Sequence, residues 1–454
     1  MRFWSLYRPG QPLLPSERAA LTCFALVICA FSALVLVRSA FLNERHTDLE
    51  VYLRAAWAVR NGKNPYVVVD SHGWHYQYPP LLAVLLVPLA DPPPGASRAG
   101  CPPFALSVVV WIGLSVAATL WATHILASAL SRQLDPPHAG WQRGDRRWWA
   151  LRLFPLYLAL PALGSTLSRG QVNLLLLALL AGMIAASMRG HAFRAGLWLA
   201  GAICLKVFPA LLLIVPLWQR DRQFLAGCAA GLAVGFVLIP GLALGPEGMV
   251  SAYQEWLGDL VLPGLGLGTS ATRQAELLET TATDNQSLQA LLHNWAWWGT
   301  PAADQPRQLA HWTRAAHWLL VAFLVMGSLW ATPGSRGDPA AQACRWMLLM
   351  VVMLVASPVC HLHYFALVLP LFSLLLAQAW QTHPPPRLPW GLAVILVLQL
   401  VLSTLPRLPG FEPLRLAGSA TFAALLVWGW ACFKHPPPKL AAEAAPAPPS
   451  TTSA

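Results

Sequence analysis

Long apolar segments alternate with short polar ones along almost the whole chain. The first apolar run, residues 19–37, is close to the roughly 20 residues that a membrane-spanning helix needs. Comparable runs are expected to form spans at approximately 104–130, 151–167, 174–188, 224–244, 315–332, 341–357, 362–381, 388–405 and 416–433. The pattern predicts an all-α integral membrane protein, a multispanning helical bundle of about 10–13 transmembrane or re-entrant helices.

A polar and aromatic segment, residues 43–80, interrupts this pattern after the first span. Within it, Thr47 and Glu50 have the spacing of a capping box, apolar residues follow at helical intervals, and Asn61-Gly62 supplies a stop signal. We therefore predict a short interfacial helix on the outer membrane surface. The apolar run 81–90 that follows is too short to span, so we expect a short helix that dips into the membrane.

Arginines between the apolar runs predict which side of the membrane each connection faces. Because arginine and lysine concentrate in cytoplasmic loops, Arg2, Arg8 and Arg18 place the N-terminus inside and the segment 43–80 outside. Further inner connections are expected around Arg132–Arg152, Arg189–Arg194, Gln219–Arg222, Arg336 and Arg387. Successive crossings then bring the following polar segments to the outer face: 43–80, 168–173, Lys206, 284–287 and 357–364. Such convergence is typical of a membrane enzyme whose active site opens outward.

The composition agrees with a membrane protein, since 56% of the residues are hydrophobic and only 11% are charged, against roughly 25% charged in soluble domains. A net charge of +11 would suggest nucleic-acid binding in a soluble protein, but here the positive residues lie between apolar runs. We therefore expect contacts with membrane lipids and no nucleic-acid partner. Neither the eight cysteines nor the polar segments show a metal-ligand spacing, so we predict no required metal and no cofactor.

We expect one polytopic domain over residues 1–433, with outer loops at 43–80 and 245–305. Residues 434–454 are rich in alanine, proline, serine and threonine, a composition that favours a disordered tail. The topology places this tail on the cytoplasmic side.

Asp48 is the first candidate for chemistry. Thr47 and Glu50 already account for the predicted helix cap, so Asp48 is not needed there and is a candidate general base at the outer face. The alternative is that Asp48 only complements the positive end of the helix dipole.

Two cations are unusual for their positions. Lys206 interrupts the apolar run 195–218, which begins and ends at inner connections. The run must therefore form a hairpin with Lys206 near its outer turn and Pro209 just beyond it. Arg169 stands at the tight outer turn 168–173, where it either binds an anion or only reaches the membrane interface.

Neutral polar residues at the outer turns also have two interpretations each. Gln171 and Asn173 suit sugar hydroxyls, or they cap the next helix. The segment Asp284–Ser287 either closes over a cavity or forms another helix N-cap. His363 could orient Asp48, bind phosphate or bind an acceptor, and it could equally be a packing residue.

Several short motifs occur along the chain in a fixed order. They are D-x-x-x-Y at Asp48–Tyr52, NGKNPY at Asn61–Tyr66, YPP at Tyr78–Pro80, GQVN at Gly170–Asn173, K-x-x-P at Lys206–Pro209, NQS at Asn285–Ser287 and S-P-x-x-x-x-H-Y at Ser357–Tyr364. In these motifs and their order, residues from about 48 to 370 resemble glycosyltransferase family 87. That family comprises multispanning GT-C enzymes that take sugars from polyprenyl phosphates. One departure is His361, which stands where the family tends to have tryptophan.

The resemblance implies a GT-C-like fold and an inverting transfer. Asp48 would deprotonate an acceptor hydroxyl, which attacks the anomeric carbon of a polyprenyl-phosphate sugar. The implied donor-phosphate ligands are Lys206, Arg169 and Arg54. The implied sugar- or acceptor-binding residues are Gln171, Asn173, Asn285, Gln286 and Tyr78, with His363 as a second catalytic candidate.

We therefore predict a hexosyltransferase of the cytoplasmic membrane that acts at the outer face on a glycolipid or envelope glycan, with mannose as the family-level expectation. The main alternative is a transporter or flippase for solutes or lipid-linked glycans. It would be expected to show inverted repeats and ionisable residues near the bilayer midplane, and the sequence shows no convincing repeat. A second alternative is an accessory subunit of an envelope-assembly complex, which would not need several polar clusters on one face.

Overall fold

The computed structural model describes residues 12–42, 47–134, 143–262, 284–301, 304–306, 309–331, 338–379 and 389–433. Within these ranges the regular structure is helical, apart from an isolated antiparallel bridge between Val69 and His75. The prediction of an all-α protein is confirmed. The expected tail, 434–454, lies outside the described residues.

Eight helical segments in the described ranges are long and apolar enough to span a membrane. They are Pro15–Leu42, Phe104–Arg132, Arg146–Arg169, Arg222–Asp259, His311–Trp330, Pro339–Ala356, Leu362–Ala379 and Trp390–Arg407. Four shorter apolar helices accompany them, at Asn173–Met188, Ala192–Leu205, Phe208–Gln219 and Ser419–Phe433. Together they agree with the expected bundle of about 10–13 spanning or re-entrant helices.

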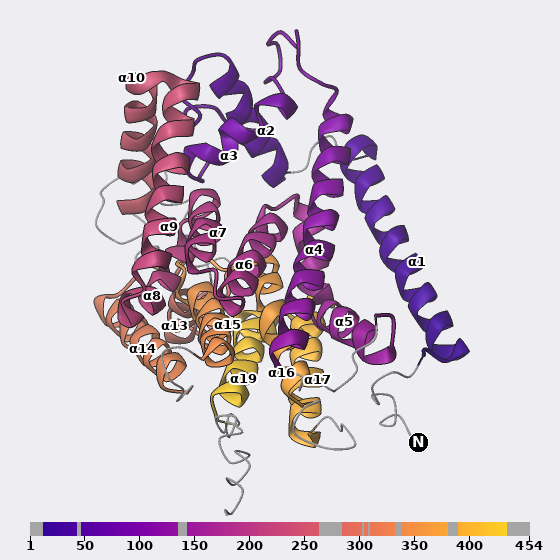
Figure 1. Ribbon diagram of the computed structural model, residues 1–454. Helices are drawn as coiled ribbons and strands as arrows, with labels where there is room; N and C mark the ends of the chain where they lie inside the picture. Colours follow the sequence, from indigo (N-terminus) through magenta and orange to yellow (C-terminus); the bar gives the residue numbers. More distant parts are fainter. Residues whose placement is uncertain are drawn as a thin grey trace, which may run out of the picture.

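Three helices with almost fully buried side chains form the centre of the bundle. They are α6 (Asn173–Met188), α15 (Pro339–Ala356) and α16 (Leu369–Ala379). A helix that is apolar on all sides is typical of a protein core or of a membrane span. The surrounding helices include α4 (Phe104–Leu134), α5 (Arg146–Arg169), α17 (Trp390–Thr404) and α19 (Ser419–Phe433) (Figure 1).

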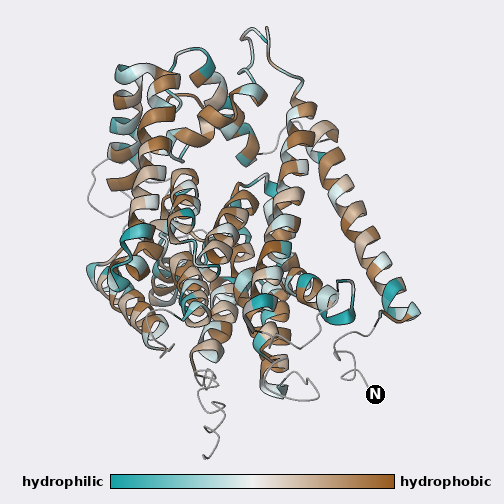
Figure 2. Cartoon of the chain, viewed as in Figure 1, coloured by the Kyte–Doolittle hydropathy of each residue, from teal (hydrophilic) through white to brown (hydrophobic). Residues whose placement is uncertain are grey.

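The outer helices carry apolar side chains that no protein covers. Helix α1 (Pro15–Val37), continued by η2 (Arg38–Leu42), slants along one edge of the molecule beside α4 (Figure 1). Leu26, Val27 and Leu34 on α1 are exposed, and Figure 2 shows apolar residues along the length of this helix. Such a surface is suited to lipid, because a soluble protein rarely leaves so much apolar area in water.

The helix is interrupted at Lys206, where the turn of a hairpin was expected. Helix α7 (Ala192–Leu205) ends at Lys206, which has extended backbone angles. The chain continues as a 3-10 helix, η4 (Phe208–Leu213), and then as α8 (Ile214–Gln219). Pro209 stands in the first turn of η4, where a missing backbone N–H is tolerated.

The predicted surface helix forms as α2 (Thr47–Arg60), and the short run after it forms α3 (Pro80–Leu85) and η3 (Val87–Leu89). From Leu49 to Val59, every residue of α2 except Trp57 is buried, so the helix is surrounded by other parts of the protein. The Thr47 side chain, and with it the predicted capping box, lies outside the described residues.

The second expected outer loop, 245–305, begins instead as helix. Helix α9 (Arg222–Leu232) continues through η5 (Ala233–Leu238) into α10 (Ile239–Glu255) and η6 (Trp256–Val261). Gly245 breaks the helical path with φ 73° and ψ 166°. Pro246 directly after the break can start a new helical turn, because it has no N–H to leave unpaired. Residues 263–283 are not described.

The other described elements lie between the break and the C-terminal helix. They are α13 (Leu288–Ala296), α14 (His311–Trp330), η8 (Leu362–Val368), η9 (Leu405–Arg407) and α18 (Glu412–Leu416).

Candidate active site

The turn between α5 and α6 holds the start of α2 in place. Gly170 ends α5 with φ 63°, a left-handed conformation that favours glycine. A Cβ atom at Gly170 would lie 2.8 Å from the Cβ of Leu49, so only glycine lets α2 approach this closely. The indole N–H of Trp111 donates to the Gly170 carbonyl at 2.8 Å, which fixes the turn from the other side.

A cluster of polar side chains follows from this packing, and we call it the Lys206 cluster: Asp48, Tyr52, Tyr78, Gln171, Asn173 and Lys206. Gln171 Oε1 is its centre, because the Tyr52 hydroxyl, the Tyr78 hydroxyl and Lys206 Nζ each lie 3.3 Å from it. Lys206 Nζ also donates to Asn173 Oδ1 at 2.9 Å. The structure thus brings together residues from four of the sequence motifs.

Asp48 stands at the edge of the cluster, in α2 and outside the candidate spans. Burial raises the pKa of its carboxyl above the usual 3.8, while Arg169, a hydrogen bond with Gln171 and the charge of Lys206 act in the opposite direction. Burial makes the carboxylate more basic, and the two cations keep it ionised. Such a carboxylate is suited to accept a proton from a hydroxyl.

Lys206 is almost completely buried. Its ammonium has three hydrogens, and two of them point to Gln171 and Asn173. The ring of Tyr364 lies 4.1 Å from Nζ and that of Tyr78 lies 5.0 Å away, so aromatic faces partly replace water around the charge. One hydrogen is left for a further acceptor, such as a ligand oxygen.

His363 lies beside the cluster and connects it to the helices. Its backbone carbonyl accepts hydrogen bonds from Thr166 Oγ1 and Asn173 Nδ2, both at 3.1 Å. The buried ring lies against those of His361 and Tyr364, with centroid distances of 5.5 and 4.9 Å. Neither ring nitrogen has a hydrogen-bond partner among the described residues. Both nitrogens therefore remain available to a ligand.

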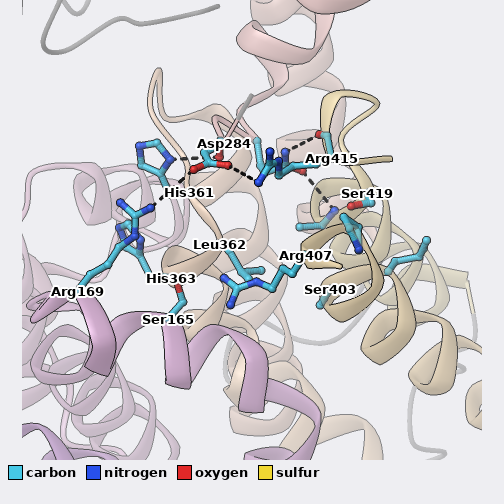
Figure 3. Close-up of a pocket in the computed structure, with 14 residues that line it drawn as sticks. Ser165, Arg169, Asp284, His361, Leu362, His363, Ser403, Arg407, Arg415 and Ser419 are labelled. Atoms are coloured by element: carbon cyan, nitrogen blue, oxygen red, sulfur yellow. Dashed lines mark hydrogen bonds and ion pairs between the residues drawn. The ribbon is translucent and has the colours of Figure 1, made fainter. Parts of the chain in front are cut away.

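A cavity of about 270 Å³ opens next to His363 (Figure 3). Three arginines line it: Arg169, Arg407 and Arg415. Asp284 pairs with two of them, through Arg169 at 3.7 Å and Arg415 at 3.1 Å. Arg407 makes no hydrogen bond or ion pair within the described part of the chain. The cavity therefore carries an excess of positive charge and suits an anionic group.

His361 forms part of the same wall. Its Nδ1 lies 3.1 Å from the Asp284 backbone carbonyl, and burial together with the nearby Arg169 lowers the pKa of its ring. The residue that departs from the family pattern thus contacts the loop that carries Asp284.

Asn285 and Gln286 are engaged in holding the chain together. Asn285 Oδ1 accepts from the backbone N–H groups of Ser287 and Cys360, at 3.0 and 3.1 Å. Gln286 Nε2 donates to the Arg415 carbonyl at 2.8 Å. Ser287 caps α13 by accepting from Ala290 N. The N-cap alternative for this segment is confirmed, and the two amides stay predictions as sugar ligands.

Arg54, the third predicted phosphate ligand, belongs to a separate group of ion pairs. It is buried and pairs with Glu50 at 2.9 Å and with Asp91 at 3.1 Å. Arg98 also reaches Asp91, at 3.0 Å. These contacts hold α2 against the segment after η3, and they engage the charge of Arg54 away from any phosphate.

Arg407 and Arg415 were not among the predicted site residues. Both lie between the two last spans, in a connection that the topology places outside. Arginines in an outer connection run against the usual charge distribution of membrane proteins. This exception was the signal that could have identified them.

Comparison with known proteins identifies the family. The sequence profile described as glycosyltransferase family 87 matches residues 76–358, more than half of the chain. The chain belongs to glycosyltransferase family 87. It is a glycosyltransferase with an all-helical fold and several helices that could span a membrane, as the motifs indicated. The matched residues include Lys206 and the 170–173 turn but neither Asp48 nor His363.

The comparisons also match two individual proteins, one of them in two solved structures. The polyprenol-phosphate-mannose-dependent alpha-(1-2)-phosphatidylinositol mannoside mannosyltransferase of Mycolicibacterium smegmatis is 26% identical over 354 residues, which cover 74% of this chain and 70% of the relative. ArnT from Cupriavidus metallidurans bound to undecaprenyl phosphate matches with 15% identity and a TM-score of 0.35, covering 90% of this chain and 78% of ArnT. Its apo structure matches with 14% identity and a TM-score of 0.38, covering 91% and 78%.

Proposed function

We propose that the protein transfers a hexose, in the first place mannose, from a polyprenyl-phosphate donor to a lipid or envelope-glycan acceptor. Family membership supports glycosyl transfer, and the name of the mycobacterial relative supports the donor class and the sugar. The observation that carries the mechanism is the position of Asp48, a partly buried carboxylate under the influence of Arg169 and Lys206.

The proposed reaction is a single in-line displacement. The Asp48 carboxylate takes the proton of an acceptor hydroxyl as that oxygen forms a bond to the anomeric carbon. The bond between the anomeric carbon and the phosphate oxygen breaks, and its electron pair leaves with the polyprenyl phosphate. Attack and departure on opposite sides invert the anomeric centre.

The leaving phosphate needs positive charge, because negative charge accumulates on it as the bond breaks. Lys206 has one hydrogen left for such an oxygen, and Arg169 borders both the Lys206 cluster and the cavity. We assign the donor phosphate to these two residues. Gln171, Asn173 and Tyr78 then face the sugar, and His363 faces the cavity side of the ligand.

Arg169 lines the cavity and its charge also acts on Asp48, so the cavity offers the substrates a place near the base. Its charge comes from Arg169, Arg407 and Arg415, and only Asp284 opposes them among its lining residues. A hydrophobic substrate tail can remain in the membrane while the charged part enters this cavity. Positive-inside topology supports a site that opens at the outer face of the cytoplasmic membrane.

The test is transfer in a purified system. Detergent-purified protein is incubated with a radiolabelled polyprenyl-phosphate mannose and a lipid-linked glycan acceptor, and the products are separated and their linkage is determined by NMR. We expect mannose on the acceptor with the anomeric configuration opposite to that of the donor. Movement of the intact donor across a vesicle without transfer would instead support the flippase alternative, and retention of configuration would refute the single displacement.

A further inference from the structure

Three side chains that could bind a metal ion meet beside α2. Glu50 comes from α2, and Asp70 and His72 come from the loop that follows it. One ligand atom from each residue can be chosen so that all three lie within 4.8 Å of one another. The Ser71 hydroxyl lies between two of these side chains, 2.6 Å from Glu50 Oε2 and 3.2 Å from His72 Nδ1.

Asp70 has a buried oxygen that nothing satisfies. Its Oδ1 accepts from the backbone N–H groups of His72 and Trp74, both at 2.8 Å, which shapes the loop. Its Oδ2 has no hydrogen-bond partner among the described residues, although the side chain is fully buried. The nearest cationic candidate is His72 Nδ1 at 3.7 Å, beyond hydrogen-bond distance. An isolated buried carboxylate oxygen costs free energy unless a cation or donor meets it.

Among the described residues, the two arginines of this region are already engaged elsewhere. Arg54 is already held by Glu50 and Asp91, and Arg98 by Asp91. Asp70 instead has a carboxylate oxygen near Glu50 and His72, and its Oδ2 lies on the side of His72 Nδ1. Two carboxylates and one imidazole form a donor set suited to zinc, which binds three protein ligands and a water molecule in tetrahedral geometry.

We propose that Glu50, Asp70 and His72 bind one Zn²⁺ ion, with water as the fourth ligand. The ion ties the 70–78 loop to α2. That loop leads to Tyr78 in the Lys206 cluster, and the first turn of α2 contains Asp48. The ion therefore fixes the position of Tyr78 relative to Asp48. The role is structural, and it stands whether or not the proposed sugar transfer is correct.

Zinc content of the untagged full-length protein tests the proposal. After dialysis with Zn²⁺ and removal of excess metal, we expect one zinc per chain by mass spectrometry of the metal, and a higher melting temperature than after chelation. Asp70→Asn keeps the Oδ1 contacts but removes the charge. His72→Gln changes a side chain that is 54% exposed, so it leaves the fold intact. Each should weaken zinc binding by at least the roughly 10–100-fold that loss of an outer-shell partner costs.

The control is His191→Gln, another exposed histidine, which stands before α7. It should bind zinc as the unaltered protein does. Absence of zinc from the unaltered protein, or equal binding by His72→Gln, would overturn the proposal. Binding of Ca²⁺ or Mg²⁺ in preference to Zn²⁺ in parallel titrations would overturn the assignment of the metal.

Discussion

The carboxyl of Asp48 gives the pH dependence expected of the enzyme. Burial raises its pKa above 3.8, and Arg169 is the strongest influence in the opposite direction. A general base works only when deprotonated, so kcat/KM should fall as the pH drops through this raised pKa. Arg169→Gln removes a charge that favours the carboxylate, and the acid limb of the profile should therefore move to higher pH.

Profiles of kcat/KM against pH for the two proteins check this expectation. Arg194→Gln serves as the control, because Arg194 is an exposed arginine near the start of α7 and far from α2 in the sequence. An acid limb that stays in place in Arg169→Gln would show that Arg169 does not act on the base.

Removal of the base itself should affect turnover and not folding. Asp48→Asn keeps the size of the side chain and tolerates a helix start, but it cannot accept the proton. We expect a loss of about 10²–10⁴-fold in kcat with an unchanged melting temperature. Glu247→Gln, an exposed acid-to-amide change on α10, should leave both values unaltered. Near-normal turnover in Asp48→Asn would return Asp48 to the helix-dipole interpretation.

The contacts of Glu50 and Arg54 could not be predicted from the sequence. The spacing of Glu50 from Thr47 suggested a helix cap, and the family resemblance implied that Arg54 binds phosphate. The structure pairs Glu50 and Arg54 with each other and brings in Asp91. Asp91 is 41 positions from Glu50, and only the fold places it there. Breaking such a buried pair typically costs about 3–5 kcal/mol.

At the scale of elements, the contact of α2 with the α5–α6 turn decides where the base lies. Gly170→Ala introduces a Cβ both at a positive φ and against Leu49. Gly62→Ala has the same kind of backbone strain, with φ 65°, but its Cβ would meet nothing within 4 Å. We expect each change to cost more than about 1 kcal/mol of stability. A larger loss of stability in Gly170→Ala than in Gly62→Ala, with a fall in activity only in Gly170→Ala, would then be due to the contact with α2.

Thermal melts and transfer rates of the two variants make this comparison. Equal losses of stability, with activity retained in Gly170→Ala, would show that the position of α2 does not depend on this close approach.

The spacing of apolar residues and the positions of helix-breaking residues predicted most elements well. The boundaries of α2 follow from Thr47 and Asn61-Gly62, and the break at Lys206 follows from a lysine and Pro209 within an apolar run. The same reasoning failed after Gly245, because a Gly-Pro pair indicates a turn but cannot say whether a helix resumes. The approach of Asp70 and His72 to Glu50 was also hidden, since it depends on how a loop folds back on a helix.

At the scale of the whole molecule, the positive-inside rule predicted that distant polar motifs meet. The structure brings Gln171, Asn173 and Lys206 into hydrogen-bond contact, and it places His363 beside them. Topology alone could assign these residues to one face but not to one cluster. Their contacts come from the packing of α6 against α7 and η8.

The orientation of the molecule in the membrane is the remaining premise of the proposed function. The connection between α3 and α4 and the turn after α8 lie at opposite ends of the bundle (Figure 1). Ser97 and Arg220 are exposed in these two connections. If the positive-inside assignment holds, the first faces outward and the second faces the cytoplasm. Ser97→Cys should then react with a membrane-impermeant maleimide in intact cells, and Arg220→Cys only after permeabilisation.

The natural cysteines set the background for this experiment. Cys23 and Cys29 are exposed but lie within the apolar helix α1, where lipid protects them from a charged reagent. Cys101 is partly exposed in the same connection as Ser97, so both variants are made in a Cys101→Ser background. Cys101→Ser alone is therefore the control, and it should give little labelling under either condition. The reverse pattern, with Arg220→Cys labelled in intact cells and Ser97→Cys protected, would turn the active site toward the cytoplasm. It would then require an acceptor on that side, while leaving the chemistry assigned to Asp48 and Lys206 unchanged.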